Sequence, residues 1–352
     1  MTGVQTCALP ISTEEELNLL CERAAGFFVY AMATIRFIDQ KTKDPETQLD
    51  RLLRSLKNEI EGRTEFRAET TLDSLYMSIL QEAFSDPEDD PKIRSVLGAV
   101  VLAINPLSPS AIAALLGFKP RDVYPLLLSA HSLLVLQEDT DHPVRPFHKS
   151  FPDFIVDPAR CINPRFRVCP SDQHPKILLG CLALMSRTLE QNMCKLPDGV
   201  INSEVNDLRE RAERYINKPL EYACRSWHKH LIDKMPARTL EILHQFLTEK
   251  FLFWLEVLSV LGAVREAVDA LEVTAKWLDV RYNSLLVDFQ KFIWAERRRR
   301  QPLTLPETTL VLYSHSLISS AFPHLISISP HFPSLPKRQW SARCTINTRV
   351  PW

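Results

Sequence analysis

Leucines recur at helical spacing in the segment TQLDRLLRSLKNEI, which runs from residue 47 to residue 60. Leu49, Leu52, Leu53 and Leu56 stand at positions i, i+3, i+4 and i+7, so they form one apolar stripe along a helix. Polar and charged residues take most of the other positions. This pattern predicts an amphipathic helix that buries its leucine face against neighbouring elements.

Two other segments show the same spacing. Residues 13–38 are predicted to form one long amphipathic helix, with Thr13 as its N-cap and Glu16 three residues later, which is the pattern of a capping box. Leu72, Leu75, Tyr76 and Ile79 repeat the stripe in LDSLYMSILQEAF. The acidic, proline-containing sequence SDPEDDP then disfavours helix. We therefore predict a helical subdomain over residues 13–90.

The next section predicts three helices followed by a β-hairpin. The helices are expected at 92–104, 107–117 and 119–133. Ser108 is the predicted N-cap of the second helix and Gly117 its C-terminal stop. Two extended runs, 133–139 and 143–151, are joined by a turn at Thr140–Pro143. Three helices and a hairpin in this order are typical of a winged helix, which we predict for residues 91–165.

The rest of the chain divides into a helical part and an irregular part. Helical spacing returns in four runs, at 174–189, 205–231, 237–262 and 264–294. Short polar connections between them predict an all-α bundle of antiparallel helices over residues 166–294. Residues 301–352 hold seven prolines, one acidic residue and no glycine. We expect 295–352 to be an irregular tail, with two competing explanations: a disordered segment, or a frameshift or intron read-through. The predicted fold class is mainly α.

Composition removes several classes of function. The net charge is −1, so the chain as a whole has no electrostatic attraction to nucleic acid or to an anionic membrane. No apolar run has the length and continuity of a membrane span. Eight dispersed cysteines, with no CxxC pair, are typical of reduced and mostly buried thiols, so we expect a cytoplasmic protein. No glycine precedes a lysine, so the phosphate loop GxxxxGK is absent, and the GH and WD repeats of a propeller are absent too.

A series of short motifs follows one order along roughly residues 16–294. The motifs are Gly26–Ala31 (GFFVYA), Ile35–Ile38 (IRFI), Leu72–Tyr76 with Ile79–Leu80, Pro106–Ser108, Leu133–Leu134, Arg145, His148–Phe154 (HKSFPDF), Tyr222–Trp227 (YACRSW) with His230–Leu231, and Trp254–Ser259 (WLEVLS). In this order they resemble the region that follows the nucleotide core of fungal NACHT proteins. Those proteins belong to the STAND class of signalling NTPases and are the fungal counterparts of NOD-like receptors.

The resemblance implies a parent protein that binds ATP or ADP in a P-loop core, with the winged helix folded back on the nucleotide in the resting state. The phosphate loop, the Mg²⁺-binding acidic residue and the sensor motifs would then precede Ser12. We therefore expect no catalytic residue and no cofactor in this chain. Its expected partner is the nucleotide-binding core, and the winged-helix surface left exposed without that core predicts self-association.

His148 is the candidate binding residue, because by the resemblance it matches the winged-helix histidine that contacts the β-phosphate of ADP. An imidazole N–H donated to a phosphate oxygen is a charge-assisted hydrogen bond. The alternative is a histidine that only makes local hydrogen bonds and supports helix packing. Loss of a phosphate contact would favour opening of the resting state.

Three other patterns are weaker candidates. A DNA-reading third helix needs a basic face, yet 119–133 has only Lys119 and Arg121, opposed by Asp122, and is expected to be buried. A run of arginines at Glu296–Arg300 fits a nucleic-acid patch, but an out-of-frame run or a solvated helix end explains it as well.

Zinc ligation is the remaining pattern. Cys224 and His228 are spaced i, i+4 on a predicted helix, whereas His230 faces elsewhere. Two ligands do not make a site, so we expect a buried Cys224 beside Trp227, with both histidines in solvent.

The first eleven residues, MTGVQTCALPI, match the in-frame translation of a sequencing-library adapter whose GTG is decoded as Met. A secretory signal would need a basic region, and this segment has no Lys or Arg. We expect residues 1–12 to be an artefact and the chain to be a non-catalytic fragment of a NACHT-type signalling protein. The alternatives are a stand-alone helical interaction module and a winged-helix DNA binder.

Overall fold

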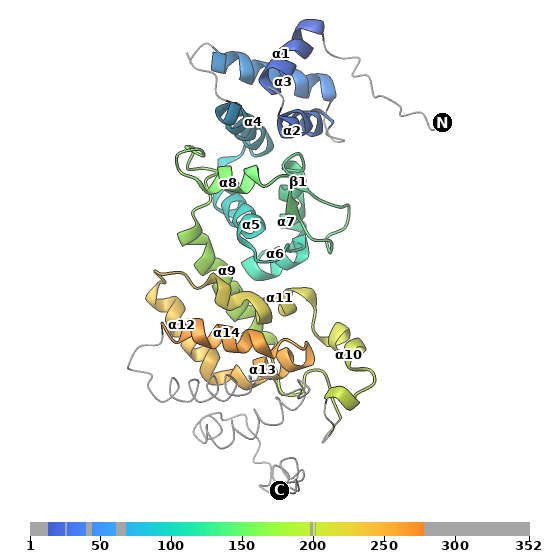
Figure 1. The fold of residues 1–352 in the computed structure, drawn as a ribbon, viewed down its shortest axis with the longest axis vertical. Coiled ribbons are helices and arrows are strands. Elements are labelled where there is room, and N and C mark those ends of the chain that lie inside the picture. The colour runs from blue at the N-terminus through green and yellow to red at the C-terminus, as the bar shows by residue number, and fades with distance from the viewer. Residues whose placement is uncertain are drawn as a thin grey trace, which may run out of the picture. The chain divides into compact units, whose positions relative to one another are not determined.

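The computed structural model describes residues 13–24, 27–39, 44–60, 68–197, 200 and 202–277. Over these residues the chain forms fourteen α-helices and one two-stranded sheet, which confirms the mainly α prediction (Figure 1). The chain divides into unit 1, residues 1–173, and unit 2, residues 174–352. The predicted adapter-derived segment, the predicted tail and the last part of the fourth helical run lie outside the described residues.

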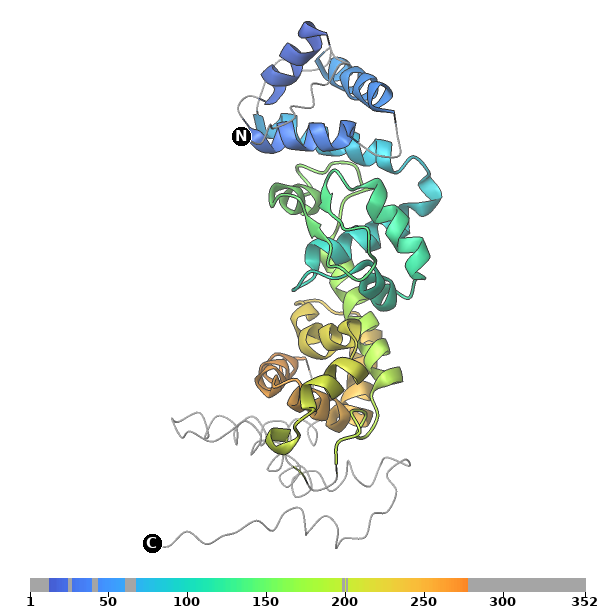
Figure 2. The same ribbon diagram turned by 90° about the vertical axis from the view of Figure 1, so that its right-hand side faces the viewer.

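Unit 1 begins with four helices, which run from blue to teal in Figures 1 and 2: α1 (Glu14–Ala24), α2 (Phe28–Ile38), α3 (Pro45–Ile60) and α4 (Ala68–Ala83). The capping box at the start of α1 is confirmed, because the Thr13 N–H donates to Glu16 Oε2 at 2.9 Å and the Glu16 N–H donates to Thr13 Oγ1 at 3.3 Å. The prediction of one long helix over 13–38 is wrong, since Phe27 has an extended backbone with φ −79° and ψ 102°. No residue of α1 is fully buried, although Leu19 and Leu20 pack against the core, whereas α2 buries five residues, so the two helices contribute unequally to the core.

The apolar stripes predicted for α3 and α4 form the core around α2. Leu49, Leu52 and Leu53 are buried on α3, and Leu53 packs with Ile38 of α2. All four stripe residues of α4 are buried as well: Leu72, Leu75, Tyr76 and Ile79. The stripe prediction is therefore confirmed for these side chains, and the helical spacing of the leucines is what brings the three helices together.

The second part of unit 1 starts with η1 (Pro87–Asp89), α5 (Asp90–Leu102), α6 (Pro109–Leu116) and α7 (Pro120–Ser129). Both predicted ends of α6 are confirmed. The Ser108 hydroxyl accepts the Ala111 N–H at 3.2 Å, and Gly117 ends the helix in the left-handed region at φ 71°. A residue with a Cβ would be strained at that φ.

The strands β1 (Leu134–Val135) and β2 (Arg145–Pro146) pair antiparallel, with Leu134 opposite Pro146 and Val135 opposite Arg145. The extended run predicted for 143–151 is only partly right, because α8 (Ser150–Val156) begins inside it. Phe151, Phe154 and Ile155 are all buried, and their i, i+3, i+4 spacing suits a helix rather than a strand.

Helices are the regular elements of unit 2 in its described part. Its elements are α9 (Pro170–Thr188, which begins at the end of unit 1), η2 (Asn202–Glu204), α10 (Leu208–Tyr215), α11 (Lys218–Ser226), η3 (Trp227–His230), α12 (Ala237–Glu249), α13 (Phe251–Val260) and α14 (Val264–Thr274). Two predicted helical runs are each divided in two. Asn217 caps α11 by accepting the Leu220 N–H at 3.0 Å, so α10 and α11 are separate helices. Lys250, at φ −121°, separates α12 from α13.

Aromatic rings form the centre of unit 2. The indoles of Trp227 and Trp254 meet edge to face, with centroids 5.6 Å apart, and Phe246 and Phe251 pack against them. The Trp254 indole N–H donates to the Cys224 carbonyl at 2.8 Å, which ties α13 to α11. The helices α13 and α14 lie side by side in this part of the fold (Figures 1 and 2). Among the described residues, no helix has both the length and the apolar character needed to cross a membrane.

Candidate functional site

His148 lies in the short segment between β2 and α8, and its side chain is exposed. The Ser150 backbone N–H donates to His148 Nδ1 at 3.2 Å, and Ser150 Oγ lies 2.8 Å from the same nitrogen. Ser150 Oγ is also 2.7 Å from the hydroxyl of Tyr76 on α4. The exposed imidazole is therefore tied on one edge to a serine, and through that serine to a helix more than seventy residues earlier in the chain.

Tyr76 joins α4 to α8 by its ring as well as by its hydroxyl. The ring is buried, with its centroid 5.5 Å from Phe151 in an edge-on contact and 5.5 Å from Phe154 in a tilted one. Burial is the main reason that the pKa of Tyr76 is raised above its usual value of 10. The phenol therefore stays protonated at neutral pH and keeps an O–H for hydrogen bonding.

An ion pair closes the same contact between the two segments. Arg160, just beyond α8, donates from Nε to Asp73 Oδ2 at 3.0 Å and from an Nη to Asp73 Oδ1 at 2.6 Å. The hydrogen bonds to Asp73 raise the pKa of Arg160. Two parallel charge-assisted bonds of this kind fix orientation as well as distance. The motifs at Leu72–Tyr76 and His148–Phe154, which are far apart in sequence, thus form one contact.

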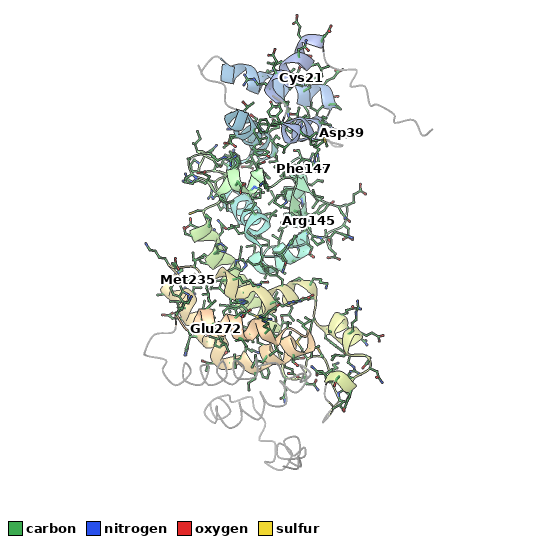
Figure 3. All side chains as sticks on the ribbon, viewed as in Figure 1. Cys21, Asp39, Arg145, Phe147, Met235 and Glu272 are labelled. Atoms are coloured by element: carbon green, nitrogen blue, oxygen red, sulfur yellow. The ribbon has the colours of Figure 1, made fainter. Side chains whose placement is uncertain are left out.

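A second contact joins α2 to the strands. The Arg36 guanidinium donates to the carbonyls of His131 at 2.6 Å and Leu134 at 2.7 Å, and it stacks over the Phe147 ring at 4.7 Å. His131 Nε2 lies 3.1 Å from the Arg36 carbonyl. Figure 3 labels Phe147, next to His148 in sequence, and Asp39 at the end of α2.

Sequence reasoning did not find this contact or the Asp73–Arg160 pair. The charged Arg36 inside an apolar helix was a visible sign that it needed a partner, but its carbonyl acceptors lie about a hundred residues away and no local pattern identifies them.

The histidines of the candidate zinc pattern are not in solvent, so that prediction is wrong. His228 and His230 are both buried, and they lie on the 3-10 helix η3 rather than on an α-helix. His230 Nδ1 is 2.9 Å from His174 Nδ1, and its Nε2 is 2.8 Å from the Tyr222 hydroxyl. Burial is the main cause that lowers the pKa of His230 to about 3 and of His228 to about 4.

The cysteines of the described region are free thiols, and four of these six are buried, as predicted. Burial raises the pKa of the Cys224 thiol far above its ordinary value, which opposes the thiolate that a metal would need. Over the residues that the structure describes, no three His, Cys, Asp or Glu side chains are grouped as a metal site.

The third helix of the predicted winged helix, α7, is buried on one face only, which corrects the expectation that it is buried as a whole. Val123 and Leu127 form the buried face. Lys119 and Arg121 are exposed, and Arg121 lies 3.9 Å from Asp122. Two exposed cations with an adjacent acid do not make a basic stripe of the kind that contacts DNA phosphates. The Glu296–Arg300 run lies outside the described residues.

Comparison with known proteins gives one informative similarity. The chain is 25% identical over 282 residues to the vegetative incompatibility protein HET-E-1 of Podospora anserina. The alignment covers 72% of this chain and 19% of HET-E-1, so the chain spans a small part of that relative. No family model matches the chain, and no solved structure matches it. HET-E-1 is a fungal protein of the NACHT and STAND type, and the similarity supports a distant relationship to such NOD-like proteins.

Proposed function

We propose that this chain is a non-enzymatic part of a NACHT-type signalling protein and that it couples nucleotide state to conformation and oligomerisation. The similarity to HET-E-1, together with the contact between the two resemblance motifs in unit 1, supports this proposal. The sequence holds no GxxxxGK loop, so ATP or ADP would be bound by a nucleotide core that this sequence does not include.

In this proposal residues 91–165 are the winged helix. The order of α5, α6, α7 and the antiparallel pair β1 and β2 supports that assignment. Residues 13–90 are the helical subdomain that follows the core, and residues 166–294 are a second helical domain. These domain boundaries come from the sequence pattern and are part of the proposal.

The residue that would read the nucleotide is His148. Its ring is exposed, and Nδ1 is engaged by Ser150, so Nε2 is the ring nitrogen left to meet an external acceptor. A phosphate oxygen of ADP would accept that N–H and hold the winged helix against the core. When the bond is lost, the population shifts toward the open state, as expected for a two-state switch.

The first test is the transcript that encodes the chain. The proposal expects an open frame upstream of the Ser12 codon that encodes GxxxxGKS or GxxxxGKT between a strand and a helix. A genomic frame that starts at its own Met near Thr13 would instead favour the stand-alone interaction module.

The second test measures ADP retention by the full-length parent protein. His148→Ala should accelerate ADP release by roughly ten-fold or more, because hydrogen bonds to charged groups contribute about 1.5–3 kcal/mol. His142→Ala is the matched control, since His142 is an exposed histidine of the same hairpin region that bonds to Asp139. Equal release rates for the wild type and His148→Ala would refute the phosphate contact.

A further inference from the structure

We propose that Tyr76 and Ser150 are positioning residues that hold His148 in one tautomer, with its proton on Nε2, and so present an N–H donor to a phosphate oxygen. The identity of the acceptor rests on the proposed function. The tautomer follows from the geometry of unit 1 alone.

The backbone N–H of Ser150 determines which nitrogen of His148 lacks a proton. An amide N–H can only donate, and it points at Nδ1 from 3.2 Å. Nδ1 must therefore offer a lone pair, which places the proton of the neutral ring on Nε2. Of the two neutral tautomers, only this one has a lone pair on Nδ1 that can accept a hydrogen bond from the Ser150 backbone N–H.

The Ser150 hydroxyl extends the same pattern to Tyr76. Since Nδ1 carries no proton, the 2.8 Å contact with Ser150 Oγ is a hydrogen bond only if the serine donates. Its oxygen then has lone pairs left, and the Tyr76 O–H donates to them across 2.7 Å. The opposite direction, serine to tyrosine, would leave two lone pairs facing each other between Oγ and Nδ1. The chain of donors therefore runs from Tyr76 through Ser150 to His148.

The packing of Tyr76 keeps this chain of donors in place. The phenol is buried between Phe151 and Phe154, and burial also keeps it protonated, so it remains a donor across the physiological range. The bidentate pair of Asp73, one helical turn before Tyr76 on α4, and Arg160, just beyond α8, holds the same two segments together.

The contact between α4 and α8 therefore strengthens the preference of His148 for the Nε2 proton beyond what the backbone amide of Ser150 provides. If α4 moves away, Ser150 loses the hydroxyl that orients its own O–H, and the imidazole is held only by the backbone amide. In the proposed function, the helical subdomain thus modulates how strongly the nucleotide-sensing histidine favours its donor state.

The experiment is nitrogen NMR of the full chain with ¹⁵N-labelled histidine, at about pH 7.5 and so roughly one unit above the ordinary histidine pKa. Protonated and unprotonated ring nitrogens resonate far apart, so the spectrum reports the tautomer directly. The His148→Gln variant identifies the signals of His148 among those of the ten histidines. Inorganic pyrophosphate is then added as the probe for a phosphate acceptor.

Four variants separate positioning from folding. In Ser150→Ala the ratio of the two tautomers should fall about five-fold, the effect of losing one hydrogen bond of about 1 kcal/mol. Tyr76→Phe keeps the ring packing and should shift the ratio in the same direction by less. Ser150→Thr keeps the hydroxyl and should restore the wild-type spectrum. Tyr124→Phe is the matched control, because the Tyr124 hydroxyl makes an exposed bond to the Gln137 carbonyl, at 3.4 Å, away from His148 in sequence.

Each outcome decides between the two claims. A wild-type His148 with its proton on Nε2, whose tautomer ratio falls about five-fold in Ser150→Ala but is unchanged in Tyr124→Phe, supports the positioning role. A mixed or Nδ1-protonated wild type overturns the positioning role, whatever pyrophosphate does. If the proton stays on Nε2 and the Nε2 signal does not shift when pyrophosphate is added, the positioning role is supported. The same result counts against the proposed phosphate contact.

Discussion

Unit 2 should lose stability at a higher pH than that at which carboxylates become protonated, because two of its histidines are buried as neutral rings. His230 is fully buried and has a pKa of about 3, chiefly from burial, with His174 and His228 lowering it further. His228 has a pKa of about 4 for the same main reason, and its Nδ1 lacks a hydrogen-bond partner within the part of the chain that the structure describes. All the causes that shift the pKa of His230 within the described part of the chain lower it.

The size of the effect follows from linkage. Both pKa values are lower in the folded chain than the ordinary 6.5, so folding favours the neutral rings. Their stabilisation is present above an unfolded pKa near 6.5 and is lost as the pH falls toward the folded values. When the pH falls from about 7 to about 5, each histidine lowers the free energy of unfolding by about 2 kcal/mol. The two together lower it by about 4 kcal/mol. That is a large part of the stability of a typical domain.

Tryptophan fluorescence isolates this effect in unit 2, since all six tryptophans lie at residue 227 or later. Urea unfolding at the two pH values should show the loss for the wild type, and roughly half of it for His230→Gln, which cannot titrate. His142→Gln is the control, because His142 is an exposed histidine of unit 1. An identical pH dependence in the wild type and His230→Gln would refute the reasoning.

Three further outcomes are expected. Asp73→Asn removes the carboxylate that accepts two bonds from Arg160 and should lower the stability of unit 1 by about 2 kcal/mol in urea unfolding followed by circular dichroism. Asp50 belongs to an exposed ion pair, so Asp50→Asn should change the stability of unit 1 little. Equal losses for the two variants would show that the Asp73 contact contributes no more than an exposed pair. Ser108→Ala should cost about 1 kcal/mol in the same assay, and no loss would mean that the cap of α6 is replaced by water. The chain should self-associate in size-exclusion chromatography with light scattering. Ile162→Ser, at a side chain 69% exposed within residues 91–165, should reduce this, whereas a monodisperse wild-type monomer would contradict it.

Much of the helical architecture could be predicted because its causes are local. The capping box at Thr13, the cap at Ser108 and the left-handed glycine at 117 each depend on atoms within a few residues of one another. The leucine stripe of α3 also depends only on spacing, since any helix with that spacing has one apolar face. These features could be identified without knowing what the helices pack against.

Where helices break was harder to predict, because tertiary burial competes with local periodicity. Phe27 interrupts a run that has unbroken helical spacing, and α1 and α2 then differ in how many residues they bury. Lys250 does the same between α12 and α13, where its ammonium reaches the Leu189 carbonyl at 2.8 Å. The two buried histidines of η3 were missed for a related reason: a histidine looks polar in sequence, and only its neighbours decide whether it is desolvated.

The candidate site divides in the same way. The sequence by itself determined that Ser150 follows His148 by two residues, ahead of Phe151 and Phe154, and it determined the helix-forming pattern of α4. Only the tertiary structure decided that Tyr76 reaches Ser150 across 74 residues of chain and that Asp73 meets Arg160 across 87. The physical reason is range: caps and stripes are set by neighbours along the backbone, whereas the proton position on an imidazole is set by whichever donors the fold brings within about 3 Å of it.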